Sequence, residues 1–196
     1  MVSGIIMASG FSKRMGKDKL LMQIDHVAIV EKVIRAAVES SLNEVIIVYR
    51  QESVKTIASH YNIKTVKNED AQKGQSTSVI KGINATDPAT DAFLFMVGDQ
   101  PFLNSDTINY LLACQANHPE HIIVPTYDGH KGSPVLFPSS FKNDLLKIQG
   151  DKGGKAVVDA AGDRVSYVQI EQINIGLDVD TPEDFSRIKY EHPSRL

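Results

Sequence analysis

The segment from Gly4 to Leu20, GIIMASGFSKRMGKDKL, begins as a short apolar run and then becomes small, glycine-containing and basic. The apolar run is typical of a buried β-strand. Small residues let backbone N–H groups approach a phosphate closely, and the cations of the loop would neutralise its charge. The loop fits neither the dinucleotide-binding pattern Gly-x-Gly-x-x-Gly nor the P-loop, because Gly10 and Gly16 are six positions apart. A solvated basic loop is the alternative interpretation.

Apolar runs that alternate with helical patterns continue along the chain. Glu44–Tyr49 and Ala92–Val97 are apolar at consecutive positions, as strands covered on both faces of a parallel sheet are. Val27–Val38 has its apolar residues on one face of a helix. This alternation predicts βαβ units and an α/β fold of three layers, with a mostly parallel central sheet and helices on both faces. We expect residues 1–196 to form a single domain.

The other expected elements follow from the same patterns. Helices are expected over Ser53–His60, Gly74–Ile83, Ser105–Ala116 with Ser105 as its cap, Phe141–Ile148, Lys155–Ala161, and Pro182–Tyr190 with Thr181 as its cap. Strands are expected over Ile63–Val66, Ile122–Val124, Pro134–Phe137, Val165–Ile170 and Ile173–Leu177, with antiparallel pairing as an option for Pro134–Phe137.

Composition limits the classes of partner and compartment. The chain has 196 residues, a formal net charge of -3 and one cysteine, Cys114. A weakly acidic chain gives no reason to expect nucleic acid as a partner, so any phosphate affinity must be local. A single cysteine excludes an intramolecular disulfide and a cysteine-built metal site, as is common in a reducing compartment. The first apolar run lacks the flanks of a signal peptide, and no stretch approaches the ~20 apolar residues of a membrane span. We therefore expect a cytoplasmic protein without a membrane partner.

Acids follow strands that are expected later in the chain. Asp99 comes directly after the apolar run Ala92–Val97. A role in stabilising the fold explains an acid at this position poorly. A carboxylate at a strand end is, however, well placed to hold a divalent cation. Asp178 and Asp180 are two positions apart and share one face of an extended segment. A turn or capping aspartate is the alternative for each acid, and it suits Asp178 better than Asp180.

A polar helix start adds a third kind of signal. Gly74-Gln75-Ser76-Thr77-Ser78 offers hydrogen-bonding groups to a base edge or a ribose, although plain capping would also explain it. Each signal is weak by itself. Their joint order is more specific: a basic glycine loop, a polar helix start, an acid after a strand and an acid near the end.

This order resembles the nucleotidyltransferases of the sugar-nucleotide and molybdopterin type. Met7–Leu20 is similar to their opening motif, Leu-Ala-Ala-Gly-x-Ser-x-Arg-Met-Gly-x-x-Lys-Leu. The segments that narrow the resemblance to molybdenum cofactor cytidylyltransferases are Gly74–Ser78, Val97–Pro101, Gly132–Phe137, Gly150–Gly154 and Asp178–Asp184. Two positions depart from the family pattern: Ser9 replaces the usual alanine, and Lys155 replaces the expected arginine.

The resemblance implies a Rossmann-like nucleotidyltransferase fold and a transfer of CMP from CTP to the terminal phosphate of molybdenum-molybdopterin, with Mg²⁺ as cofactor and release of pyrophosphate. It implies that the backbone of Ala8, Ser9 and Gly10 wraps the nucleotide. Arg14 and Lys19 are implied as catalytic residues that hold the triphosphate. Asp99 is implied as a catalytic metal ligand, with Asp180 as the second carboxylate. The remaining residues are implied near the nucleotide (Gln75, Ser76, Ser78 and Gly98) or near the acceptor (Gln100, Gly132, Ser133, Pro134, Asp151, Gly153 and Gly154).

The chemistry needs no general base, because a phosphate nucleophile is already ionised near neutral pH. Three alternatives stay open. One is a guanylyltransferase that makes a guanine dinucleotide cofactor, and another is a cytidylyltransferase for a sugar or alditol phosphate. The third is a nucleotide-binding protein that delivers cofactor to a molybdoenzyme without catalysis. A recipient molybdoenzyme or its chaperone is the expected protein partner.

Overall fold

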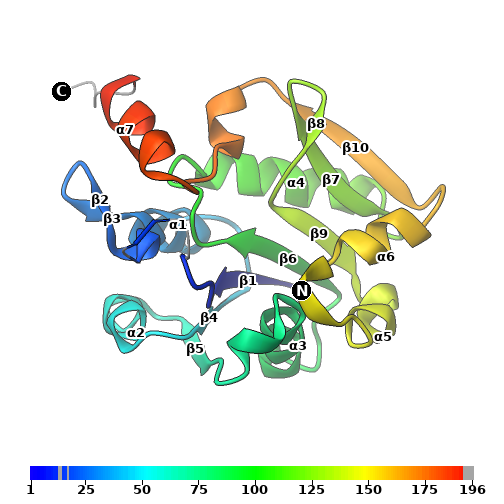
Figure 1. Cartoon of the computed structure of the whole chain (residues 1–196). Helices are drawn as coiled ribbons and strands as arrows, with labels where there is room; N and C mark the ends of the chain where they lie inside the picture. The colour runs from blue at the N-terminus through cyan, green and yellow to red at the C-terminus, as the bar shows by residue number, and fades with distance from the viewer. Residues whose placement is uncertain (13–14, 17, 192–196) are drawn as a thin grey trace.

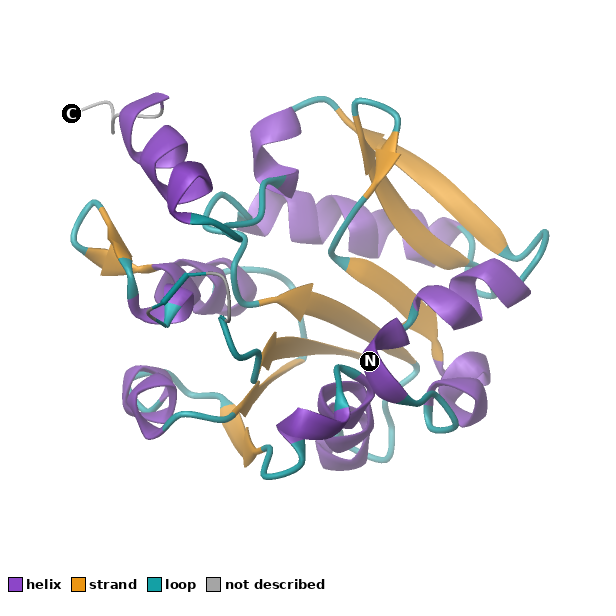
Figure 2. Cartoon of the chain, in the orientation of Figure 1, coloured by secondary structure: helices purple, strands orange, loops and turns teal. Residues whose placement is uncertain are grey.

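In the part of the chain that the structure describes, a sheet of eight strands forms the middle layer (Figures 1 and 2). The computed structural model describes residues 1–12, 15–16 and 18–191. The strand order is β10-β7-β9-β6-β1-β4-β5, and β8 pairs with β7. The strands are β1 (Val2–Ala8), β4 (Glu44–Tyr49), β5 (Lys64–Lys67), β6 (Ala92–Val97), β7 (Ile122–Tyr127), β8 (His130–Lys131), β9 (Val135–Pro138) and β10 (Val165–Ile170). A separate hairpin pairs β2 (Gln23–Ile24) with β3 (Val27–Ala28).

Helices cover both faces of this sheet, as the sequence predicts. Apolar side chains of α1, α2 and α4 share one core cluster with the sheet, and those of α3, α5 and α6 share another. In Figure 1, α4 lies behind the sheet and α6 in front of it. The helices are α1 (Ile29–Val38), α2 (Glu52–Ala58), α3 (Ser76–Ala85), α4 (Ser105–Asn117), α5 (Lys142–Leu145), α6 (Lys155–Ala160) and α7 (Pro182–Glu191). None of the helices in the described ranges is long and apolar enough to cross a membrane.

The central strands are apolar at consecutive positions because each of their faces meets a helical layer. In β6, Phe93 and Phe95 belong to the cluster that contains α3, α5 and α6. Leu94 and Met96, at the alternate positions, belong to the cluster that contains α1, α2 and α4. Successive side chains of a strand point to opposite faces, so one apolar run supplies both cores. The three-layer α/β fold class is therefore confirmed.

The strand order reverses at β1: β4 and β5 follow on one side of it, and β6 lies on its other side. Strand β1 pairs in parallel with β4 on one side and with β6 on the other. The mostly parallel sheet also contains antiparallel strands: β9 lies between β6 and β7, and the short β8 pairs with β7. In open α/β sheets, ligands bind beyond the carboxyl ends of the strands at such a reversal. The loops after β1 and β6 therefore occupy the expected binding crevice.

A small third core cluster ties the end of the chain to its beginning. Met15, Ile24 and Ile29 pack with Val179 and Ile188 in this cluster. The C-terminal segment also bonds directly to the end of β6, where the backbone N–H of Val179 donates to the carbonyl of Asp99 at 3.1 Å. These contacts bring the segment around residue 180 beside the loop after β1.

Side-chain hydrogen bonds at the start of α7 fix the direction of the helix that follows the segment around residue 180. The backbone N–H of Asp184 donates to Thr181 Oγ1 at 3.1 Å, and that hydroxyl donates to Asp184 Oδ2 at 2.8 Å. This reciprocal cap, with Pro182 at the first helical position, is the helix start that the sequence predicts.

The structure corrects three sequence predictions. Ile173–Leu177 is not a strand; Ile173–Gly176 is a 3-10 turn, because the chain here leaves β10 and crosses back toward β6. Helix α1 begins at Ile29 rather than Val27, since Asp25 and His26 adopt positive φ in the turn of the β2–β3 hairpin. Asn104, rather than Ser105, caps α4 through a bond from the Thr107 N–H of 2.8 Å.

Candidate active site

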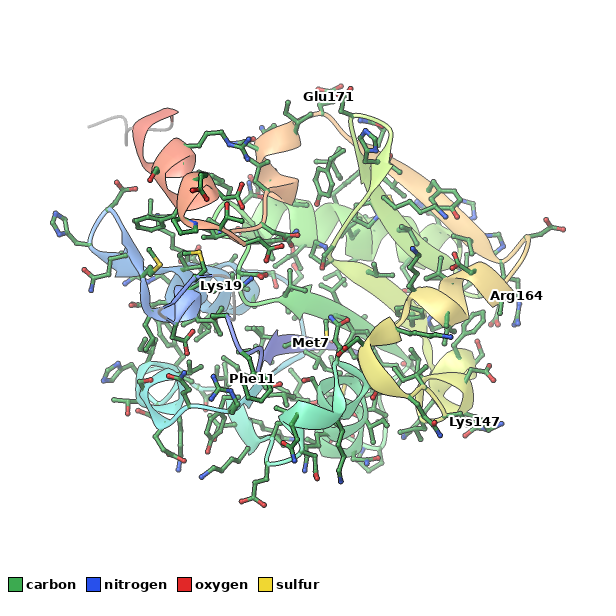
Figure 3. The ribbon with its side chains drawn as sticks, in the orientation of Figure 1. Met7, Phe11, Lys19, Lys147, Arg164 and Glu171 are labelled. Atoms are coloured by element: carbon green, nitrogen blue, oxygen red, sulfur yellow. The ribbon has the colours of Figure 1, made fainter. Side chains whose placement is uncertain are left out.

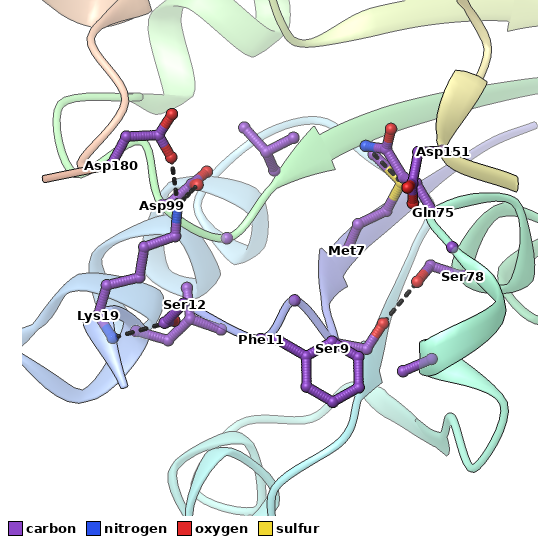
Figure 4. Close-up of a pocket in the computed structure, with 16 residues that line it drawn as sticks. Met7, Ser9, Phe11, Ser12, Lys19, Gln75, Ser78, Asp99, Asp151 and Asp180 are labelled. Carbon is purple, nitrogen blue, oxygen red and sulfur yellow. Dashed lines mark hydrogen bonds and ion pairs between the residues drawn. The ribbon is translucent and has the colours of Figure 1, made fainter. Parts of the chain in front are cut away.

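A cavity of about 420 Å³ opens where β1 and β6 end (Figure 4). Figure 3 places Met7, Phe11 and Lys19 together on this side of the sheet. The residues that line the cavity are Met7, Ser9, Gly10, Phe11, Ser12, Lys19, Leu20, Ala71, Gly74, Gln75, Ser78, Val97, Gly98, Asp99, Asp151 and Asp180. Segments that are far apart in the sequence therefore meet around one space.

One ammonium group joins two carboxylates at one end of this cavity. Lys19 Nζ lies 2.5 Å from Asp99 Oδ2 and 2.7 Å from Asp180 Oδ1 (Figure 4). The Lys19 side chain is 13% exposed and that of Asp99 is 18% exposed, so water screens their attraction only partly. Burial alone would lower the pKa of Lys19, but the charge of Asp99 and the hydrogen bonds that the ammonium donates to both carboxylates outweigh it and raise that pKa. Lys19 is therefore a cation at neutral pH.

Local hydrogen bonds place Lys19 in this position. Asp18 caps the short 3-10 turn Lys19–Leu21, because its Oδ1 accepts from the Leu20 N–H at 3.1 Å. The Lys19 N–H donates to Ser12 Oγ at 3.3 Å. Leu20 is buried and anchors the turn in the core that contains α1. The glycine-containing loop thus has a fixed end from which Lys19 reaches the carboxylates.

The two carboxylates suit a divalent cation. Asp99 and Asp180 already converge on one positive group, and Asp99 Oδ1 is buried without a hydrogen-bond partner among the described residues. Carboxylate oxygens are the ligands that Mg²⁺ prefers. Within the described ranges no third His, Cys, Asp or Glu completes a metal-binding group, so water and substrate phosphates would fill the other positions. Asp180, rather than Asp178, shares Lys19 with Asp99.

A buried network of polar side chains forms another wall of the cavity. Ser9 Oγ and Ser78 Oγ lie 2.5 Å apart (Figure 4). The amide nitrogen of Asn68 lies 3.0 Å from Ser9 Oγ, 2.9 Å from Thr77 Oγ1 and 3.2 Å from Ser78 Oγ. The hydroxyl of Thr77 donates to the carbonyl of Gly74 at 2.8 Å.

Sequence reasoning missed Asn68, which is 1% exposed and organises this network. It follows β5 directly, and its N–H donates to the carbonyl of Tyr49 at 2.7 Å. A polar residue just beyond an expected strand was the signal that could have found it.

The segment at the start of α3 contacts the glycine loop near residue 150. Gly74 has φ +106°, and a Cβ there would lie 2.4 Å from the backbone carbon of Gly150. A Cβ on Gly153 would lie 2.5 Å from Gln75 Oε1. The glycines therefore permit a close approach of two predicted motifs, which puts Gln75 and Asp151 into the same cavity.

A second cavity of about 550 Å³ adjoins the first, and Met7, Gln75 and Val97 line both. Its wall is largely apolar, with cations at several positions. The remaining lining residues are Val79, Phe95, Val124, Lys131, Gly132, Ser133, Val135, Phe137, Lys152, Gly154, Lys155, Val158, Asp159 and Asp178. Gly132, Ser133 and Gly154, which the resemblance implies near the acceptor, thus lie around a space next to the first cavity.

Some predicted site residues are placed elsewhere. Ala8, Ser76, Gln100 and Pro134 are buried and are not among the residues that line either cavity. The Gln100 side chain instead donates to the carbonyl of Gly176 at 3.4 Å, which supports the crossing segment before Asp178. Arg14 lies outside the described residues.

Asp178 has a shifted acidity. Burial, followed by the charge of Asp99, raises the pKa of Asp178 from 3.8 to about 6. The residue borders the second cavity and is open to water there, although protein surrounds it on its other sides. Because the folded state binds this proton more tightly than the unfolded chain, the group stabilises the fold at low pH. That contribution is lost as the pH rises through about 6.

We therefore expect Asp178→Asn to remove part of the pH dependence of stability. The stability of the wild type relative to this variant should fall between about pH 4 and pH 7. Water in the cavity screens the charge, so the change should stay below about 1 kcal/mol. Urea denaturation over this range measures it, with the exposed Asp163→Asn as control. Parallel pH profiles for wild type and Asp178→Asn would contradict the assignment.

Comparisons with known proteins agree with this geometry. The family model described as "MobA-like NTP transferase domain" matches residues 4–165. The purine catabolism protein PucB of Bacillus subtilis is 28% identical over an alignment of 198 positions, which covers 95% of each chain. The molybdenum cofactor cytidylyltransferase of Escherichia coli is 28% identical over 187 residues, which cover 94% of each chain.

Solved structures share the fold. The crystal structure of Rv0371c from Mycobacterium tuberculosis matches with a TM-score of 0.85 at 22% identity, covering 96% of this chain and 97% of that one. A manganese complex of Rv0371c matches with a TM-score of 0.78 at 21% identity, covering 95% and 97% of the two chains.

The family match runs from β1 into β10 and contains the loop after β1, the start of α3 and Asp99. These are the segments that meet around the first cavity. The resemblance implied by the sequence is therefore confirmed, and the chain belongs to the MobA-like NTP transferase domain family.

Proposed function

We propose that this protein transfers CMP from CTP to the terminal phosphate of molybdenum-molybdopterin, with Mg²⁺ as cofactor. The observation that carries the proposal is the meeting of Lys19, Asp99 and Asp180 at one end of a cavity that adjoins a second one. The first cavity would hold the nucleotide and the second the acceptor. The similarity to the molybdenum cofactor cytidylyltransferase of E. coli and the manganese in a structural relative support the same assignment.

The proposed reaction is a single displacement at phosphorus. An oxygen of the acceptor's terminal phosphate forms a bond to the α-phosphorus of CTP, and the bond between that phosphorus and the bridging oxygen of the β-phosphate breaks. Pyrophosphate leaves with the electron pair of that bond. Both reactants are anions, so positioning and charge neutralisation supply most of the catalysis, and no covalent enzyme intermediate is required.

In the proposed reaction, the carboxylates would hold the metal and the lysine would neutralise the leaving phosphates. Asp99 and Asp180 would hold Mg²⁺, which when bound supplies positive charge near the reacting phosphates. Lys19 would then neutralise the phosphates that become pyrophosphate, as a cation released from the carboxylates by the metal. Backbone groups at Ser9 and Gly10 would lie against the nucleotide, since both residues line the first cavity.

A count of hydrogens in the buried network supports cytosine as the base. Asn68 can only donate to the hydroxyl oxygens of Ser9 and Ser78, and one of these hydroxyls donates to the other. Thr77 uses its own hydrogen on Gly74. One hydroxyl hydrogen remains without an acceptor in the described part of the chain, and it would face the cavity as a donor. The pairing edge of cytosine offers two acceptors, N3 and O2, whereas that of guanine carries N–H donors next to its carbonyl.

Turnover with the two nucleotides tests this proposal. With molybdenum-molybdopterin as acceptor, we expect pyrophosphate release from CTP to exceed that from GTP by about 10-fold or more in kcat/KM. Asn68→Asp replaces the amide donor with an acceptor, so the hydroxyls of Ser9 and Ser78 would both donate to the new carboxylate and neither would donate to the base. We expect this variant to have a reduced preference for CTP. Asn117→Asp, at the exposed end of α4, is the matched control.

Each of the other outcomes identifies a different function. Equal or faster turnover of GTP would contradict the cytosine assignment. CTP turnover with a sugar or alditol phosphate, but not with molybdopterin, would contradict the acceptor. Nucleotide binding without pyrophosphate release would instead make the protein a cofactor-delivery factor.

A further inference from the structure

Arg50 contacts the loop after β1 from outside the two cavities. Its guanidinium carbon lies 4.5 Å from the centre of the Phe11 ring, and its terminal nitrogen donates to the carbonyl of Gly10 at 3.4 Å. Arg50 follows β4, whose last residue, Tyr49, pairs with Ala8 at the end of β1. The parallel pairing of β1 and β4 therefore carries the Arg50 side chain to the same sheet edge as this loop.

The guanidinium of Arg50 contacts the loop after β1 but does not satisfy all of its own hydrogen-bond donors within the described ranges. The Nε atom of Arg50 is buried and has no hydrogen-bond partner among the described residues. Leaving a charged donor in that state is unfavourable, so hydrogen bonding by Nε does not account for where the guanidinium lies. A guanidinium stacks flat on an aromatic face and can donate a hydrogen bond from its edge at the same time.

The two contacted residues belong to the wall of the first cavity. Gly10 and Phe11 both line it, and Phe11 is 43% exposed. Arg50 itself is not among the lining residues. Arg50 can therefore shape this cavity through the position of the Gly10 carbonyl and the Phe11 ring.

We propose that Arg50 is a positioning residue for the nucleotide, which acts by holding the Gly10–Phe11 segment in its binding conformation. This inference rests on the proposed nucleotide site. Without the guanidinium, the segment loses one stacking contact and one hydrogen bond, and ordering it has to be done by the ligand. A ligand that has to order a loop when it binds does so more weakly, because the loss of conformational entropy offsets part of the interaction energy. The chemistry at the α-phosphate occurs elsewhere and is unaffected.

Calorimetry of CTP binding in the presence of Mg²⁺ tests the inference. We expect Arg50→Gln, which keeps much of the length and removes the charge, to weaken binding by about 5- to 20-fold. KM for CTP should rise by a similar factor while kcat changes by less than about 2-fold, as for a loss of uniform binding. Arg50→Lys keeps the charge without the planar fork and should fall between wild type and Arg50→Gln.

A double-mutant cycle separates this role from general destabilisation. Phe11→Leu should weaken CTP binding, and the further change Arg50→Gln should then cost about 3-fold less than it does in the wild type, because its partner ring is already gone. Arg35→Gln is the matched control: Arg35 lies on α1 and donates to the Tyr61 hydroxyl and the Glu31 carboxylate, not to the described part of the loop after β1. It should leave CTP affinity unchanged.

Several results would overturn the inference. Wild-type CTP affinity in Arg50→Gln, additive effects in the cycle, or a loss of kcat with unchanged KM would each contradict it. If Arg50→Gln does not fold, Arg50→Lys and Phe11→Leu decide the same question. A wild-type protein that binds no nucleotide would instead contradict the proposed function, so the two failures are distinguishable.

Discussion

Lys19→Met should lower turnover by about 100-fold or more and, at the same time, tighten the binding of Mg²⁺ to the nucleotide-free protein by about 10-fold. In the structure the Lys19 ammonium lies between Asp99 and Asp180, where it offsets both negative charges. Removing it leaves two converging carboxylates that attract a divalent cation more strongly. The triphosphate loses a cation in the same variant, so a gain in metal affinity and a loss of catalysis are expected together.

Metal binding and melting temperature measure the first effect, and pyrophosphate release measures the second. The melting temperature of Lys19→Met should fall in metal-free buffer and recover when Mg²⁺ is added, because the metal replaces the missing charge. Lys64→Met, which removes a lysine paired with Glu44 at the sheet edge, is the control. Normal turnover of Lys19→Met would remove Lys19 from the site. Weaker metal binding would contradict the placement of the cation between the two carboxylates.

Asp99→Asn should lower kcat by about 100-fold or more and leave the fold intact. Asparagine has the shape of aspartate but carries no charge, so it would hold neither the metal nor the Lys19 ammonium with comparable strength. Asp99 Oδ1, buried and unpartnered among the described residues, is the oxygen that the substitution most directly affects. Pyrophosphate release at saturating CTP and acceptor gives the change in kcat, and metal titration gives the change in affinity.

A control for this variant lies at the other end of the same strand. Asp91 precedes β6 and pairs with the N-terminal amine at 2.6 Å, far from the cavity along the strand. Asp91→Asn should leave both kcat and metal affinity unchanged. Full activity of pure Asp99→Asn protein would refute the metal assignment for Asp99, whichever nucleotide the enzyme prefers.

Most of the fold could be predicted from local patterns. The runs Glu44–Tyr49 and Ala92–Val97 are strands with the predicted bounds, since short runs of consecutive apolar residues suit a sheet that is covered on both faces. The cap of α7 at Thr181 was also predictable, because capping depends on neighbours within one turn. Ile173–Leu177 was predicted incorrectly, since a short apolar run without a pairing strand has no local feature that separates it from a turn.

The candidate site was predictable in its residue types and less so in its contacts. Acids and cations after strands indicated a phosphate and metal site at one edge of the sheet. Asn68 and Arg50 were not found, because each acts through hydroxyls, a carbonyl or a ring that other segments of the chain supply. Such contacts join residues with no regular spacing in the sequence.

The amino-acid sequence by itself determined the order of strands and helices and which strand ends carry charge, since both depend on residues close together in the chain. Only the tertiary structure decided that Lys19 meets Asp180, which is 161 positions away, and that Asp178 borders the second cavity. The reversal of the strand order at β1 and the packing of Val179 and Ile188 on the hairpin after the loop produce that meeting. Long-range packing of this kind depends on the complementary shapes of distant surfaces, which no local sequence pattern records.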